Sequence, residues 1–338
     1  MFSSLHTHLV VDVQAHWFPP RYLAALQSVA AGSGRAAEIA ARALNDPLRK
    51  AEPVFTGAID RRLELMDAAS VAVQAISFAA PNVWSDDVAV RRAVTEAFND
   101  GVADLAREHP GRFALMATLP LPHVEASVAE ARRALDELGA AGLALCTHFD
   151  GAPIDDLRFD PLYAFLSERE AAVLLHPEGF FVPGALADHG MEWAIGTPFD
   201  DTIAALRLIY GGVLERHPGI RWIVPHLGGT IPFLAQRLDF IWRLNPKVRE
   251  LLPAEPTSYL RRLWYDTANP DPRAIALAAE LVGPDRLLYG SDFPFVSRND
   301  LGFGLERIDE TGFDAPTRAA VVGGTAARLL RLSAEGSA

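Results

Sequence analysis

Short apolar runs alternate with longer amphipathic stretches along most of the chain. Eight of these runs have the length and apolar content of buried strands. They cover Leu9–Val13, Ala72–Phe78, Phe113–Thr118, Gly142–Cys146, Ala172–Leu175, Ile220–Pro225, Leu263–Asp266 and Arg286–Gly290. Strands that alternate with helices are typical of βα units, which build parallel sheets. Eight such units predict an α/β fold of the (β/α)8 or TIM-barrel type.

The stretches between the runs predict helices around the outside of this barrel. Asp86–Glu108 is long and polar along one face, and His123–Leu138 and Asp200–Arg216 repeat apolar residues at three-to-four spacing. Pro-Gly pairs at 110–111 and 218–219 precede predicted strands, as expected where a helix ends. The alternation continues to the eighth strand.

Two segments are longer than ordinary βα loops, namely Phe18–Gly57 after the first strand and Phe180–Phe199 after the fifth. Both leave the barrel at the carboxyl ends of the strands, where barrel enzymes place their sites. A final helix over Pro316–Leu332 is expected to cover the barrel. Because barrels of this size form one unit, we expect residues 1–338 to fold as a single domain.

Composition and charge narrow the class of partner. The chain has 31 Lys and Arg against 43 Asp and Glu, a net charge of −12, which argues against nucleic-acid binding. We find no signal-peptide pattern and no apolar run of about 18 residues, so we expect no membrane partner and a cytoplasmic location. The one cysteine, Cys146, excludes an internal disulfide and a cysteine-based zinc site. Any metal must therefore rest on histidines and carboxylates.

Four chemically active side chains directly follow predicted strands. His16 follows the first strand, His176 the fifth, His226 the sixth and Asp292 the eighth. A lone histidine at a strand end is more often structural, but four such residues at the same end of a barrel favour one site. Two imidazoles and a carboxylate suit one divalent metal, zinc or alternatively manganese, with open positions for water and substrate. His226 would then move a proton beside the metal.

Other candidate residues carry weaker signals. His6 and His8 have the His-x-His spacing of many metal sites, but His8 lies about 26 Å before His16 at about 3.3 Å per residue, near the barrel bottom. His148, after the fourth strand, either lines a substrate pocket or is structural. Cys146 lacks an adjacent base and is expected to be an unreactive packed thiol.

Four ordered motifs point to a family. They are Val-Asp-Val-Gln-Ala-His-Trp-Phe-Pro at 11–19, His-Pro at 176–177, Val-Pro-His-Leu-Gly-Gly at 224–229 and Tyr-Gly-Ser-Asp-Phe-Pro at 289–294. Together they resemble the amidohydrolase-related, metal-dependent decarboxylases, within them the aminocarboxymuconate-semialdehyde and 6-methylsalicylate decarboxylases. Each motif alone is modest, whereas the ordered set covers almost the whole chain. The resemblance implies an amidohydrolase-type barrel.

The resemblance also implies roles for individual residues. His16, His176 and Asp292 fall on metal ligands, and His226 falls on the histidine that activates metal-bound water or moves the proton. Trp193 falls on a tryptophan bordering the pocket. Arg237 falls on an arginine that, in the muconate enzymes, reaches the substrate carboxylate across a dimer interface, which implies a homodimer.

Two positions depart from the family pattern. Gln14 stands where most members have the first histidine of His-x-His and some have Glu, so its amide oxygen either binds the metal weakly or hydrogen-bonds to a metal-bound water. The run Pro53–Thr56 lacks the second carboxylate-binding arginine of the muconate enzymes, which disfavours the muconate substrate. Arg49 and Lys50, just upstream, are possible replacements.

The leading hypothesis is a metal-dependent, non-oxidative decarboxylase of a small aromatic or unsaturated carboxylic acid. The metal would polarise a substrate oxygen or a water, and His226 or Asp292 would assist protonation of the carbon that loses the carboxylate. A set of aromatic residues would either line an apolar pocket or pack in the core. It comprises Trp17, Phe18, Trp84, Phe180 and Trp193.

Two alternatives stay open. One is a mononuclear metal-dependent hydrolase or hydratase acting on a lactone, amide or related bond, because a metal-bound water is already a nucleophile. The fourth strand carries no lysine of the kind that bridges two metals. The other is a non-catalytic binding barrel with a decayed metal site, suggested by Gln14. No phosphate loop or dinucleotide motif is present, so no organic cofactor is expected.

Overall fold

The structure is a computed structural model that describes residues 9–46, 53–57, 59–80, 82–178, 186, 188–296 and 300–332. In these residues one eight-stranded sheet runs in the order β1-β2-β3-β4-β7-β8-β9-β10. Its strands are β1 (Val10–His16), β2 (Val71–Ser77), β3 (Phe113–Ala117), β4 (Gly142–Cys146), β7 (Ala172–His176), β8 (Arg221–Val224), β9 (Trp264–Asp266) and β10 (Leu287–Leu288). A small hairpin of β5 (His148–Phe149) and β6 (Ala152–Pro153) lies apart. All eight predicted strands are present.

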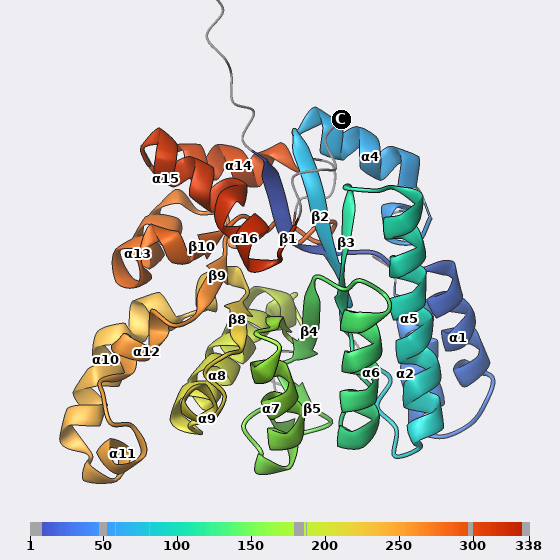
Figure 1. Cartoon of the computed structure of the whole chain (residues 1–338), viewed down its shortest axis with the longest axis horizontal. Coiled ribbons are helices and arrows are strands. Elements are labelled where there is room, and N and C mark those ends of the chain that lie inside the picture. The colour runs from blue at the N-terminus through green and yellow to red at the C-terminus, as the bar shows by residue number, and fades with distance from the viewer. Residues whose placement is uncertain are drawn as a thin grey trace, which may run out of the picture.

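The sheet closes on itself between its first and last strands. The Val13 amide donates to the Tyr289 carbonyl at 3.0 Å, and Ala15 forms a parallel bridge with Phe293. In Figure 1 the colours run round the ring of strands until β10 lies beside β1. The predicted (β/α)8 barrel is therefore confirmed. β1 continues to His16, beyond its predicted end, because the segment after β10 supplies these additional hydrogen-bond partners.

Helices surround the barrel, and most follow a strand. They are α1 (Pro20–Ala30), α2 (Arg35–Leu44), η1 (Pro53–Phe55), α4 (Ile59–Ala68), α5 (Val88–Glu108), α6 (Val124–Asp136), η2 (Leu157–Phe159), α7 (Asp160–Glu168), η3 (Glu192–Gly196), α8 (Thr197–Tyr210), α9 (Val213–Arg216), η4 (His226–Gly228), α10 (Ile231–Leu244), α11 (Pro246–Leu251), α12 (Pro256–Leu260), α13 (Pro272–Val282), η5 (Pro284–Arg286), α14 (Gly302–Asp309), α15 (Ala315–Ala319), η6 (Ala320–Gly324) and α16 (Thr325–Leu329). The helix predicted over 200–216 is divided because Gly212 adopts φ 72°, a left-handed conformation. No helix in the described residues has the length and apolar character needed to span a membrane.

In its described parts, residues 18–46 and 53–57, the long segment after β1 is largely helical rather than an extended loop. Its helices α1 and α2 bury Tyr22, Leu26 and Ala40. Pro19 packs so tightly on α5 that a Cβ at Gly101 would lie 2.2 Å from it. The segment is thus a packed cap that holds the end of α2 over the rim of the barrel.

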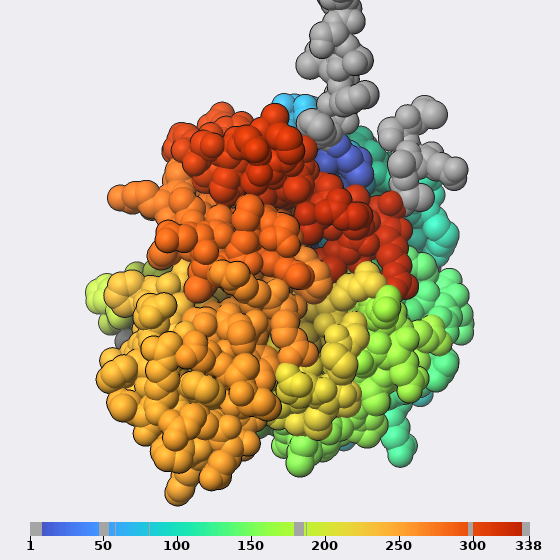
Figure 2. All heavy atoms as spheres, turned by 60° about the vertical axis from the view of Figure 1, so that its left-hand side comes forward, coloured from blue at the N-terminus to red at the C-terminus, as the bar shows by residue number. Residues whose placement is uncertain are grey.

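The C-terminal helices cover the amino-end of the barrel. The barrel interior is a cluster of small and branched apolar side chains that includes Val11, Val13 and Met116, and Leu329 of α16 packs against it. A Cβ at Gly323 of η6 would lie 1.7 Å from the Leu9 carbonyl, so the backbone of η6 directly contacts the residue before β1. Figure 2 shows these helices in red against the blue first strand.

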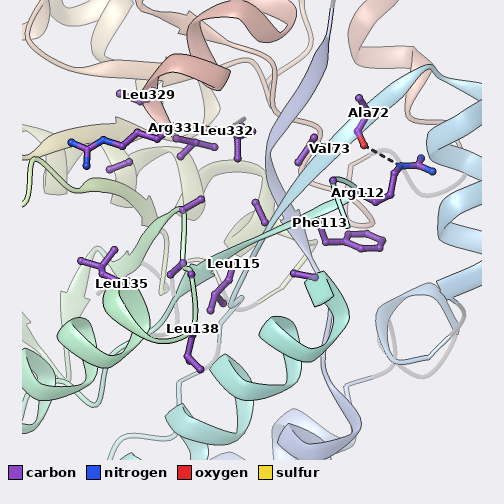
Figure 3. A pocket seen from close by; sticks show the side chains of 18 of the residues that line it. Ala72, Val73, Arg112, Phe113, Leu115, Leu135, Leu138, Leu329, Arg331 and Leu332 are labelled. Atoms are coloured by element: carbon purple, nitrogen blue, oxygen red, sulfur yellow. Dashed lines mark hydrogen bonds between the residues drawn. The ribbon is translucent and has the colours of Figure 1, made fainter. Parts of the chain in front are cut away.

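A hollow of about 820 Å³ also lies at the amino-end. The starts of β2, β3 and β7 and the segment before β4 line it together with the end of α16 (Figure 3). Arg112 borders it but is already engaged, since it donates to the Ala72 carbonyl at 3.1 Å and pairs with Asp67 at 2.7 Å. In TIM barrels this end contributes stability, whereas catalysis occurs at the carboxyl ends of the strands.

Candidate metal and acid–base site

The four residues selected from strand ends lie together at the carboxyl end of the barrel. Nε2 of His16 lies 3.0 Å from Oδ1 of Asp292, and Nε2 of His226 lies 3.6 Å from Oδ2 of the same carboxylate. The rings of His16 and His176 meet edge to face, with their centroids 4.9 Å apart. All four side chains are buried. The tertiary structure thus joins residues from β1, β7, β8 and β10 in one cluster.

Two of these residues have unusual backbone conformations. His226 and Asp292 adopt φ 53° and φ 51°, in the left-handed region that residues other than glycine rarely enter. The His226 amide donates to Oδ1 of Asp266 at 2.9 Å, and the Asp292 amide donates to the Gln14 carbonyl at 2.9 Å. In the same turn Gly229 has no room for a Cβ, which would lie 1.9 Å from a carbonyl at the start of α8. Such strain is concentrated at functional sites.

His226 is oriented by a buried carboxylate on α8. Its Nδ1 lies 2.8 Å from Oδ2 of Asp201. Burial opposes protonation, but the charge and hydrogen bond of Asp201, with those of Asp292, raise the pKa of His226 well above its ordinary value. Burial raises the pKa of Asp201 to about 6, still below neutral pH. The surroundings of His226 therefore favour its protonated form, held between two carboxylates.

The remaining side chains of the cluster suit metal ligation. Nδ1 of His176 donates to the Pro177 carbonyl at 2.9 Å, which leaves the Nε2 lone pair free. Burial, then the nearby charge of His16, lowers the pKa of His176 to about 3, so its ring is neutral. Burial would raise the pKa of Asp292, but hydrogen bonds from His16 and His226 hold it below its ordinary value. Asp292 is thus an ionised carboxylate.

The donor types suit a divalent cation, since two imidazoles and one carboxylate lie next to one another at the carboxyl end of the barrel. Among the described residues, no three His, Cys, Asp or Glu side chains already form a cage around a common point. His16 and Asp292 instead hydrogen-bond directly to each other. The three side chains thus suit a metal in donor type and in closeness to one another, while His16 and Asp292 are hydrogen-bonded to each other in this structure.

Gln14 faces the same space from β1. We assign its amide with the nitrogen toward Asp266, because that orientation gives a hydrogen bond of 2.5 Å to Oδ2, whereas the opposite one sets two acceptors against each other. The assigned orientation places the Gln14 oxygen on the side of His226 and Asp292. The terminal amide atom at that position lies 3.5 Å from Nε2 of His226 and 3.4 Å from Oδ1 of Asp292. A neutral oxygen donor therefore stands beside the two imidazoles and the carboxylate.

A pocket of about 360 Å³ opens above the cluster, with His176, His226 and Asp292 at its floor. Trp193 of η3 borders its mouth and is 54% exposed. The Trp193 ring stacks on Phe295 at 5.9 Å, and Phe295 meets His16 edge to face at 5.5 Å. An aromatic wall therefore runs from solvent to the cluster, as a flat apolar substrate requires.

Other predicted residues lie elsewhere. Trp17, Phe18 and Trp84 are buried in the core and do not line this pocket. His148, in the β5–β6 hairpin, is also outside it, as is Arg237, which is exposed on α10. Burial raises the pKa of Cys146 well above its ordinary value, as expected for an unreactive thiol. Some candidate positions fall outside the described residues: His6, His8, Arg49, Lys50 and Phe180.

Sequence reasoning missed three acids of the site. Asp266 and Glu178 could have been found, because Asp266 ends a predicted strand and Glu178 follows His-Pro. Glu178 lines the pocket and accepts hydrogen bonds from the Asn82 side chain at 2.9 Å and the Trp84 indole at 3.1 Å. Burial raises its pKa. Asp201 gave no signal, because it lies within a helix 25 residues before its partner His226.

Known proteins resemble the chain in sequence and fold. The 2-amino-3-carboxymuconate-6-semialdehyde decarboxylase of Dictyostelium discoideum is 29% identical over 236 residues, which are 69% of this chain and 65% of the relative. The 6-methylsalicylic acid decarboxylase of Penicillium expansum is 26% identical over 296 residues, 84% of each protein. A crystal structure of 5-carboxyvanillate decarboxylase from Novosphingobium aromaticivorans, complexed with manganese and 4-hydroxy-3-methoxy-5-nitrobenzoic acid, covers 98% of both chains with a TM-score of 0.84 at 21% identity.

The structural likeness establishes a shared fold, and the two curated relatives match the two groups that the motifs resemble. The family model described as amidohydrolase matches residues 6–332. That span includes all eight strands of the barrel and the four residues at their carboxyl ends. The resemblance drawn from the motifs is thereby confirmed, and the chain belongs to the amidohydrolase family.

Proposed function

We propose that this protein is a metal-dependent, non-oxidative decarboxylase of a small aromatic or unsaturated carboxylic acid. The observation that carries the proposal is the meeting of His16, His176 and Asp292 at the carboxyl end of the barrel, beneath a pocket whose floor His176, Asp292 and His226 form. The relatives described above are decarboxylases, which supports the same reaction class here.

His16, His176 and the Asp292 carboxylate would hold the metal, with the Gln14 oxygen as a further neutral ligand. When bound, the metal supplies positive charge that polarises a substrate oxygen or a water. Zinc and manganese both suit this donor set. The manganese in the carboxyvanillate enzyme makes manganese the first metal to test, and zinc the second.

The chain's own residues supply the proton and the binding surface. Asp201 holds Nδ1 of His226, so Nε2 presents its proton to the pocket. That proton passes to the substrate carbon bearing the carboxylate, the bond to the carboxylate breaks, and its electron pair returns to the substrate as carbon dioxide leaves. His226 then regains a proton from solvent. Trp193 and Phe295 would hold the flat substrate against the wall of the pocket.

We also propose a homodimer through α10. Phe233, Arg237, Phe240 and Leu244 share one face of this helix, and the three apolar residues are 86%, 56% and 63% exposed. Figure 2 brings the surface over α10 to α13 forward. An exposed apolar stripe of this kind marks a protein interface. Arg237, inside the stripe, would reach the partner's pocket. The single domain and the cytoplasmic location remain predictions.

Product analysis tests the reaction. Manganese-loaded protein is incubated with hydroxybenzoic acids and released carbon dioxide is measured, in parallel with a His226→Asn variant. We expect release by the parent and a loss of about 10²–10⁴-fold in the variant, the usual contribution of a positioned acid. Release at the parent rate by the variant would show that His226 is not the proton donor. Lactone or amide hydrolysis without carbon dioxide would favour the hydrolase alternative.

A further inference from the structure

Arg62, near the start of α4, is a fully buried arginine beside the site. A guanidinium in such a place is costly unless its donors are paired. Its Nη1 donates to Oε1 of Gln74 at 2.9 Å. Its Nη2 donates to the His16 carbonyl at 2.5 Å and to the Val54 carbonyl at 3.0 Å. Arg62 therefore binds the backbone of His16, one of the residues proposed to hold the metal.

His16 is fixed on both sides of its backbone and through its ring. Its amide donates to the Phe293 carbonyl at 2.8 Å, while its own carbonyl accepts from Arg62. Nδ1 of the ring lies 3.2 Å from both the carbonyl and the hydroxyl oxygen of Ser77. These contacts point Nε2 toward Asp292, at 3.0 Å. Arg62 thus completes the set of contacts that determines where His16 lies.

A chain of buried hydrogen bonds also connects Arg62 to the segment that carries Asp292. Beyond the bond from Arg62, Nε2 of Gln74 donates to Oδ2 of Asp12 at 2.9 Å. Oδ1 of Asp12 in turn accepts from the Ser291 amide at 2.9 Å. Ser291 immediately precedes Asp292, so this chain ends at the residue before the carboxylate.

The guanidinium reaches the other side of Asp292 through Phe293. Cζ of Arg62 lies 4.7 Å from the centroid of the Phe293 ring, which is fully buried. A cation over an aromatic face is attracted to it most strongly where water is excluded. Asp292 itself has φ 51°, a conformation that persists only when its surroundings enforce it. Arg62 is therefore linked to the residues before and after Asp292 as well as to His16.

The planar shape of arginine is needed for this combination of contacts. A guanidinium can donate in several fixed directions in its plane while its face lies on a ring, whereas a lysine ammonium is a single point charge. Arg91 makes the same types of contact in another part of the barrel wall. It is also buried, lies 5.0 Å from the Trp84 ring, and donates to the carbonyls of Val83, Leu119 and Leu121. Arg62 differs from Arg91 in what it is connected to.

We propose that Arg62 is a positioning residue that sets the placement of His16 relative to Asp292 and thereby the metal affinity of the site. It acts on His16 directly and on Asp292 through the residues on either side of it. This inference rests on the proposed metal-dependent function and adds the residue that joins the two metal-binding segments.

Arg62→Lys tests this role, because it keeps a positive charge but loses the planar set of donors. The dissociation constant of manganese is measured by calorimetry on metal-free protein. We expect it to rise about 10–100-fold, the usual effect of losing a residue that orients metal ligands. Arg91→Lys is the matched control, since it should lower the free energy of unfolding in urea but leave the dissociation constant unchanged.

A second variant, Gln74→Met, interrupts the chain to Asp12 and leaves the bond from Arg62 to His16 in place. We expect the dissociation constant of manganese to rise about tenfold in this variant. It decides the question if Arg62→Lys does not fold, because unchanged manganese binding by Gln74→Met would then overturn the proposal.

Two outcomes with folded Arg62→Lys would overturn the positioning role. One is a dissociation constant equal to that of the parent, and the other is an equal rise in Arg62→Lys and Arg91→Lys, which would indicate a general effect of stability. A parent that binds neither manganese nor zinc would overturn this inference and the proposed function together. A parent that binds manganese and releases carbon dioxide, with both Arg62→Lys and Gln74→Met retaining its dissociation constant, would overturn the inference alone.

Discussion

Oδ2 of Asp201 accepts a hydrogen bond of 2.8 Å from Nδ1 of His226, and this contact determines which ring nitrogen faces the pocket. The carboxylate comes from α8 and the imidazole from the end of β8, so two neighbouring βα units define the proton donor. The bond also stabilises the protonated ring in a buried place, where an unpaired imidazolium would lose its proton.

Asp201→Asn should therefore slow the reaction without weakening substrate binding. We expect kcat to fall about 10–100-fold, the usual effect of losing an orienting partner, with little change in KM. Because Asp201 raises the pKa of His226, the parent keeps its proton donor above pH 6.5 and loses activity as pH rises through the raised pKa. In the variant this loss should begin at lower pH. Profiles of kcat against pH provide the measurement, with Asp136→Asn on the surface as control. An unshifted profile would contradict the orienting role.

Metal content should depend on the Asp292 carboxylate and respond to Gln14. Protein purified without chelators should carry about one equivalent of divalent metal, and Asp292→Ala should lose it. Gln14→His replaces a neutral oxygen donor by an imidazole, so we expect metal to bind about tenfold tighter. Elemental analysis and competition with a chelator measure both effects. Full occupancy in Asp292→Ala would exclude this carboxylate as a ligand. A metal-free parent whose site fills in Gln14→His would indicate a decayed site.

The buried Asp12, which joins β1 to the segment after β10, makes the stability of the barrel depend on pH. It is fully buried and accepts hydrogen bonds from the Gln74 side chain at 2.9 Å and from Ser291, yet burial raises its pKa to about 6. Because the pKa of Asp12 is higher in the folded chain than in the unfolded chain, the protonated carboxyl stabilises the fold. This stabilisation is complete below the ordinary pKa of 3.8 and is lost as pH rises through about 6.

The new side chain in the Asp12→Asn variant does not titrate. The free energy of unfolding of this variant should therefore increase relative to that of the parent as pH rises. We expect a relative gain of about 1–2 kcal/mol between pH 5 and pH 8, whatever the absolute cost of the substitution. Urea unfolding of metal-free parent and variant at both pH values measures this difference. Asp86→Asn, at an exposed position, should show no comparable change. A relative gain on going to lower pH would contradict the sign of the shift.

The exposed stripe on α10 predicts a dimer that contributes to activity. Phe233→Asp should convert dimer to monomer in sedimentation experiments, because a charge would replace the most exposed of the apolar contacts. Arg237→Ala should keep the dimer but raise KM for the acid about tenfold, because the partner's pocket loses a charged hydrogen bond. A monomeric parent, or full activity in a monomeric Phe233→Asp variant, would contradict the shared site.

The sequence by itself determined the barrel and the core of its site. Apolar runs report local burial, and the end of such a run marks the carboxyl end of a strand, so His16, His176, His226 and Asp292 could be selected without coordinates. Parallel strands in a closed ring bring those ends together, and the structure has them in contact.

Only the tertiary structure determined the partners of the site residues, the packing of the segment after β1 and the end of β1. Asp201 lies on a helix, where the sequence pattern shows which face is buried but not which distant side chain that face meets. The segment from Phe18 to Gly57 was recognised by its length, yet only the packing of its described part shows two helices, α1 and α2, the second of which ends beside the pocket. Even the end of β1 depended on hydrogen bonds from residues near Asp292, almost 280 positions away. Such contacts lie far apart in sequence, so no local pattern encodes them, and they exist only after the barrel has closed.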